Sequence, residues 1–164
     1  MTLTERLFAT RLLQVALVGL AVTSCTITAK GPGAEISKVK YYLLQPQEIL
    51  RTQDPAIQFE RQHYLYGAFT AAEQIARTGA YYTVMWRALD RTQPVTVRFE
   101  YRQEKTALVV KTLEQEVTDL RRHNLTEFKV VGKDFETGGR VTAWRVTLLR
   151  GKEELVSQNS YLWK

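Results

Sequence analysis

Residues 95–102, Val-Thr-Val-Arg-Phe-Glu-Tyr-Arg, alternate apolar and polar side chains without a break. Successive side chains of a β-strand point to opposite faces, so this period of two is typical of a strand with one face in a core and the other in water. Pro94, which has no backbone N–H to donate to a sheet, stands just before the run. The stretch therefore predicts a half-buried strand and a mainly β fold.

The same alternation returns elsewhere in the chain, mostly in its carboxy-terminal half. Further strand-like runs cover residues 39–44, 82–88, 126–131, 141–149 and 155–163. Residues 150–153, Arg-Gly-Lys-Glu, separate the last two runs and predict a hairpin turn. We interpret the glycine-rich stretch 132–139 as another hairpin connection between strands.

Residues 107–122 fit two interpretations. The apolar run 108–110 favours a strand, whereas the apolar residues that follow it have the spacing of one helix face. We expect a strand to about residue 117 and a turn at 121–124.

One short helix is expected among the strands. Thr70-Ala71-Ala72-Glu73 is a capping box, which predicts a helix over residues 70–78 with Gly79 at its carboxy-terminal end. About seven strands, short connections and one small helix are typical of an antiparallel β-sandwich, here assigned to residues 38–164. An immunoglobulin-like architecture without the core cysteine pair and a small closed barrel are both compatible with this pattern. The expected core residues are Val84, Trp86, Val97, Phe99, Tyr101, Phe128, Val130, Trp144 and Val146.

Composition narrows the class of protein. The chain has 164 residues, 45% of them hydrophobic and 24% charged, which suits a single globular domain. Its net charge of +6 comes from 23 basic and 17 acidic residues that do not cluster. Nucleic-acid-binding proteins usually concentrate basic residues in a patch or stripe, so no nucleic-acid partner is expected.

The amino terminus has the layout of an export signal. Arg6 and Arg11 give residues 1–11 a positive charge, and residues 12–22 form an apolar stretch interrupted only by Gln14. The stretch is too short for a permanent membrane-spanning helix, which needs about 20 apolar residues. Cys25, the only cysteine of the chain, follows after Thr23 and Ser24. A lone cysteine at the end of an apolar run indicates a processing site.

Val22-Thr23-Ser24-Cys25 resembles the lipobox of bacterial lipoproteins. The resemblance implies that residues 1–24 are a signal peptide removed before Cys25, and that the Cys25 thiol carries a diacylglycerol. It also implies anchoring to the cell envelope, with the outer membrane favoured, because the residue after the cysteine is Thr26 and not the aspartate that retains such proteins at the inner membrane. An ordinary cleaved signal with an incidental cysteine is the alternative. Residues 25–37 are interpreted as a flexible tether, because Gly31-Pro32-Gly33 cannot continue regular structure.

No catalytic, metal or cofactor site is expected. His63 and His123 are the only histidines, and neither has a second ligand at metal-binding spacing. The sequence contains no phosphate-binding glycine loop ending in lysine and no Gly-x-Ser-x-Gly motif. We interpret both histidines as solvated loop residues and expect the protein not to be an enzyme.

A recurring aromatic–arginine pair is the strongest candidate for a site. Trp86-Arg87, Tyr101-Arg102 and Trp144-Arg145 each lie in a strand-like run. If the aromatic side chains face the core, the arginines face outward, where Arg98 joins them. The row is either an anion-binding surface or an arginine–glutamate ladder that keeps an exposed sheet soluble.

The sequence favours a membrane-anchored envelope lipoprotein with a non-enzymatic interaction domain. The arginine row would then contact an envelope protein, an anionic cell-wall component or lipid headgroups. The alternative is a periplasm-facing module that binds a small ligand or glycan, with Tyr81 and Tyr82 in an open cleft. A pocket with converging polar groups would favour the ligand-binding module.

Overall fold

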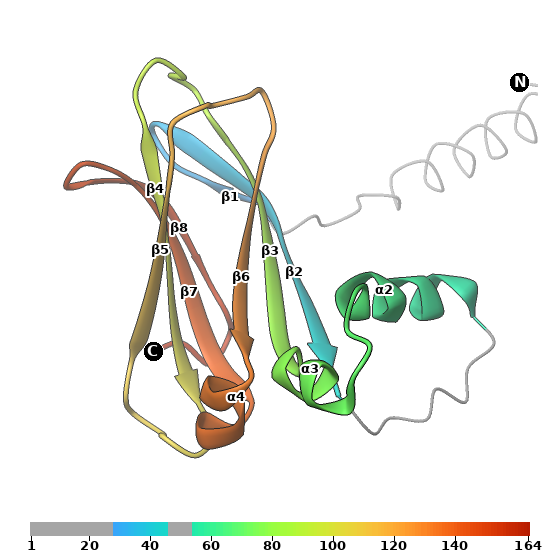
Figure 1. The fold of residues 1–164 in the computed structure, drawn as a ribbon. Helices are drawn as coiled ribbons and strands as arrows, with labels where there is room; N and C mark the ends of the chain where they lie inside the picture. The colour runs from blue at the N-terminus through green and yellow to red at the C-terminus, as the bar shows by residue number, and fades with distance from the viewer. Residues whose placement is uncertain (1–27, 46–53) are drawn as a thin grey trace, which may run out of the picture.

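Two four-stranded antiparallel sheets pack face to face in the computed structural model (Figure 1), which describes residues 28–45 and 54–164. The first sheet has the strand order β1 (Ala29–Lys30), β2 (Ala34–Leu44), β3 (Gly79–Ala88), β6 (Asn124–Val131). The second has the order β5 (Lys111–Val117), β4 (Val95–Gln103), β7 (Val141–Arg150), β8 (Glu153–Asn159). The predicted β-sandwich is confirmed, as two separate sheets and not as a closed barrel.

The core lies between the sheets and follows the alternation of the strands. In β4, Val95, Val97, Phe99 and Tyr101 are buried while the residues between them are partly exposed. All the expected core residues are buried except Trp144, which packs against the core but remains partly exposed. Among the described residues, every member of the buried core cluster lies between residues 34 and 156.

The expected tether is wrong for residues 29–37. β1 pairs with β2 through Ala29 and Ile36, and Ile36 is fully buried opposite Trp86 of β3. Gly31-Pro32-Gly33 breaks regular structure as expected, but it forms the turn that joins these two paired strands. A Cβ on Gly31 would stand 1.9 Å from the backbone oxygen of Leu155, which shows how tightly this turn packs on β8. Residues 25–27 lie outside the described residues.

In the described part of the chain, the structure confirms the predicted helix and adds two more. α3 (Ala71–Ala76) begins with the predicted capping box of Thr70 and Glu73. α2 (Pro55–Leu65) was not predicted, although Asp54 caps it and Pro55 occupies its first turn, both ordinary signals of a helix start. Within the described residues, no helix is long and apolar enough to span a membrane.

α4 (Lys133–Gly138) stands where a hairpin connection was expected, and that interpretation is wrong. β6 and β7 belong to different sheets, so the chain must cross from one sheet to the other and cannot turn back in a hairpin. Gly132 and Gly139 flank the helix with φ of 59° and 77°, a conformation that favours glycine. The strand expected from residue 107 begins only at Lys111. The predicted turn between β7 and β8 is confirmed.

Candidate functional site

The four predicted arginines are divided between the two sheets. Arg98 and Arg102 of β4 and Arg145 of β7 share the outer face of the second sheet, because Arg145 pairs across the strands with Glu100. Arg87 belongs to β3 and faces outward from the first sheet. Three of the four residues therefore lie on one sheet face, and the fourth lies on the opposite side of the sandwich.

Each of these arginines already has a partner within the chain. Arg98 Nε lies 2.5 Å from Glu114 Oε1, Arg145 Nε lies 2.8 Å from Glu100 Oε2, and Arg87 pairs with Glu35. The guanidinium of Arg102 lies 4.8 Å from the ring centre of Trp163, and that of Arg145 lies 5.3 Å from it. The arrangement fits the arginine–glutamate ladder better than a surface with free positive charge.

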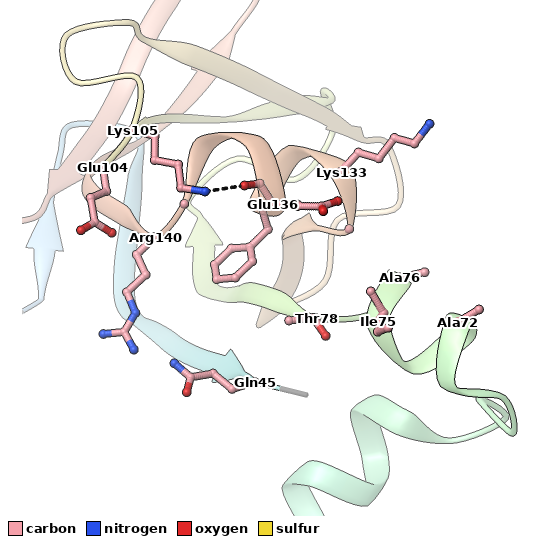
Figure 2. Close-up of a pocket in the computed structure, with 13 residues that line it drawn as sticks. Gln45, Ala72, Ile75, Ala76, Thr78, Glu104, Lys105, Lys133, Glu136 and Arg140 are labelled. Carbon is pink, nitrogen blue, oxygen red and sulfur yellow. Dashed lines mark hydrogen bonds between the residues drawn. The ribbon is translucent and has the colours of Figure 1, made fainter. Parts of the chain in front are cut away.

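A groove of about 840 Å³ opens at the end of the sandwich where the helices gather (Figure 2). One wall is formed by exposed residues of α3, and the other is formed by α4 and the loop that follows β4. Figure 2 shows Arg140 and Gln45 on one side of the groove and Ile75 of α3 on the other. The lining residues are Gln45, Ala72, Ile75, Ala76, Thr78, Glu104, Lys105, Gly132, Lys133, Phe135, Glu136, Gly139 and Arg140.

Apolar and charged groups alternate around this end groove. Ile75 and Phe135 supply apolar surface, and charged side chains of both signs stand at the rim. Lys105 Nζ donates to the backbone oxygen of Glu136 at 2.8 Å. Among the described residues, no ion pair within 4.0 Å involves Glu104, Lys133, Glu136 or Arg140. All four side chains are exposed.

The position of α4, and so of the groove wall, depends on Asp134. Its carboxylate accepts a hydrogen bond from the Tyr101 hydroxyl at 2.6 Å and pairs with Lys111. Gln103, which is fully buried, donates to the backbone oxygens of Asp134 at 3.0 Å and of Gly139 at 3.1 Å. Partial burial opposes ionisation of Asp134, but the hydrogen bonds from Lys111 and Tyr101 outweigh it and hold the pKa of Asp134 below its ordinary value of 3.8.

Replacing Asp134 with asparagine is expected to lower the free energy of unfolding at neutral pH by about 1 kcal/mol, because the carboxylate is partly exposed and its pair with Lys111 is screened. The folded state depresses the pKa of Asp134, so this stabilisation is complete above the unfolded value. It disappears as the pH falls through the folded value. Urea unfolding between neutral and acidic pH would measure it. Glu136→Gln on the same helix is the control, and an Asp134→Asn protein with unchanged acid sensitivity would contradict the assignment.

Tyr81 and Tyr82 do not share one cleft, although Tyr81 lines two surface hollows of about 380 and 330 Å³. Tyr82 points into the core, where its ring centre lies 4.7 Å from that of Phe99. Tyr81 faces the other side and is covered by Tyr64 of α2, with ring centres 4.2 Å apart. Tyr64 also stacks on Tyr42 at 4.7 Å. Burial raises the pKa of Tyr81 to about 12, and its hydroxyl donates to the backbone oxygen of Arg77 at 2.6 Å.

The two histidines are exposed, as expected for solvated residues, although His63 lies in α2 and not in a loop. In residues 28–45 and 54–164, no group of three or more His, Cys, Asp or Glu side chains could hold a metal ion.

The sequence did not indicate the end groove. Its walls come from α3, α4 and the loop after β4, which are distant in the chain, and the sequence predicts a hairpin connection in place of α4. Phe135 is an apolar residue among polar and glycine neighbours, and this is a weak signal for such a site. Comparisons with protein families, curated proteins and solved structures found no match.

Proposed function

We propose that this chain is a cell-envelope lipoprotein whose β-sandwich is a non-enzymatic interaction domain. The support for the anchor is the signal layout and the lipobox-like residues 22–25, with delivery to the outer membrane favoured by Thr26. The support for interaction is the end groove, which combines apolar side chains with charged groups that have no ion-pair partner among the described residues. The partner is another protein of the envelope.

The exposure of the groove residues favours a protein partner over a small ligand. Ile75 is 57% exposed, and Ala72, Ala76, Lys105 and Arg140 are exposed as well. Small-molecule sites usually enclose about 70–90% of the ligand surface, which such open walls do not do. A protein segment laid along the groove would cover Ile75 and Phe135 and could pair with charges of both signs.

Two other candidates have observations in their favour. The volume of the groove lies within the range of about 300–1,000 Å³ that is usual for ligand sites. Binding of a small ligand or glycan is therefore the second candidate function. The outer face with Arg98, Arg102 and Arg145 is the second surface for an acidic envelope protein or cell-wall component. There, an incoming anion would have to displace Glu100 and Glu114.

A photocrosslinking amino acid at position 75, in the full chain in intact cells, is expected to capture one defined envelope protein. Adding Arg140→Gln in a second variant should reduce the yield severalfold, because Arg140 has no ion-pair partner among the described residues. The same crosslinker at Thr112, which is exposed on the outer face of β5, is the matched control. Capture from position 112 and not from position 75 would mean that the partner binds the outer face of the second sheet, which carries Arg98, Arg102 and Arg145. Capture from neither position would contradict the proposal.

A further inference from the structure

Three lysines share the outer face of the first sheet at its β1–β2 edge. Lys38 and Lys40 alternate with core-facing residues in β2, and Lys30 of β1 lies across from the outward-facing Glu35. All three lysines are exposed. None of them takes part in an ion pair within 4.0 Å in the described part of the chain. We call Lys30, Lys38 and Lys40 the lysine edge.

The acidic residues of the same face are already engaged. Glu35 pairs with Arg87, and Glu127 of β6 pairs with Lys129. The face thus carries five basic side chains and two acidic ones. Glu60 of α2 is a further carboxylate nearby, since it lines a hollow of about 330 Å³ together with Lys38 and Lys40.

The outer face of the second sheet is balanced by comparison. Its three arginines are opposed by at least as many glutamates, namely Glu100, Glu114, Glu116 and Glu154. The uncompensated positive charge of the sandwich faces therefore lies on the first sheet, beside the point where the chain enters the fold.

That entry point is close to the proposed anchor, so this step rests on the proposed function. Cys25 and Ala29 are four residues apart, and four residues span at most about 14 Å when fully extended. β1 is paired with β2 from Ala29 onward, and the turn after it packs on β8. A lipid on Cys25 would hold the lysine edge within reach of the bilayer surface, and bilayers rich in anionic phospholipid attract such residues.

We propose that the lysine edge is a second membrane contact, which binds the phosphates of anionic phospholipids in the membrane that holds the anchor. α2 lies over the same outer face of the first sheet, because the ring of its Tyr64 contacts the rings of Tyr42 and Tyr81. The helix exposes Ile57 and Phe59. Apolar and aromatic side chains beside basic ones are typical of surfaces that rest in the interfacial layer of a membrane. The contact turns the outer face of the first sheet toward the bilayer.

The test uses residues 25–164, the mature chain that the proposed function implies, and this range contains the whole core cluster of the described residues. Cys25→Ser is included because the lipid would mask the weaker contact. Vesicles of phosphatidylcholine alone and mixed with phosphatidylglycerol are the probes. We expect the protein to bind the mixed vesicles only. The triple variant Lys30→Gln/Lys38→Gln/Lys40→Gln should lower the partition coefficient roughly 10- to 100-fold. High salt should have the same effect, because it screens the exposed lysine charges. Arg91→Gln/Arg122→Gln/Lys152→Gln, the same charge change at exposed positions elsewhere, is the control and should lose less than about threefold.

Equal losses in both triple variants would show that net charge alone acts, and the proposal would be wrong. Equal binding to the two kinds of vesicle, or to neither, would also overturn it. Attachment of lipid to Cys25 is measured separately in cells. If vesicle binding depends on the lysines but Cys25 carries no lipid in cells, the proposed function is wrong and the lysine edge is still a membrane contact. If Cys25 carries lipid but vesicle binding does not depend on the lysines, the proposed function stands and the proposal for the lysine edge is wrong.

Discussion

Replacing Trp86 with alanine is expected to lower the free energy of unfolding by about 3–5 kcal/mol, the cost of emptying a large buried site. Trp86 is 2% exposed, lies between the sheets and donates from its indole Nε1 to Thr126 Oγ1 at 3.0 Å. Alanine would leave a cavity in the core and a buried Thr126 hydroxyl without this donor. Denaturant unfolding followed by far-ultraviolet circular dichroism measures the change.

Trp144→Ala is the matched control, because Trp144 packs on the same core but is partly exposed. We expect a smaller loss there, since less of its surface leaves water on folding. A loss below about 1 kcal/mol for Trp86→Ala would mean that the faces of β3 are assigned the wrong way round.

Replacing Cys25 with alanine is expected to abolish lipid attachment and to leave a precursor that keeps residues 1–24. The sulfur of Cys25 is the only thiol in the chain, so no other residue can take its place. Incorporation of labelled fatty acid, mass spectrometry and membrane fractionation of cells that express the full chain would measure the change.

Ser24→Ala is the control for this prediction, because it keeps a small residue before the cysteine and should leave processing intact. Normal cleavage and release of the Cys25→Ala protein would identify residues 1–24 as an ordinary secretion signal. The proposal that the chain is a lipoprotein would then be wrong.

The sequence alone predicts the strands well, because a period of two is a local property that needs only neighbouring residues. Val97, Phe99 and Tyr101 were assigned to the core on this basis, and all three are buried. The same reasoning turned Arg98 and Arg102 outward, as the structure has them. It did not place Arg87, since the alternation reveals the face of a strand but not the sheet to which the strand belongs.

The parts that were missed depend on contacts between distant segments. The tether was expected because Gly31-Pro32-Gly33 stops regular structure, yet only the pairing of β1 with β2 shows that it is a turn within a sheet. α4 was missed because its crossing between sheets cannot be seen in residues 132–139 alone. The end groove combines both problems, since it needs α4 and the correct arrangement of the strands around it.

The connection between β2 and β3 has a thermodynamic consequence. Leu44 and Gly79 face each other as cross-strand partners, so residues 45–78 close a loop that a short turn could also close. Closing a loop of about 34 residues loses more chain entropy than closing a loop of four residues. The difference lowers the free energy of unfolding by about 2 kcal/mol. Neither α2 nor α3 has a buried residue that would offset this cost through the core. In the described part of the connection, the ring contacts of Tyr64 with Tyr42 and Tyr81 and the burial of Ala68 act against this cost.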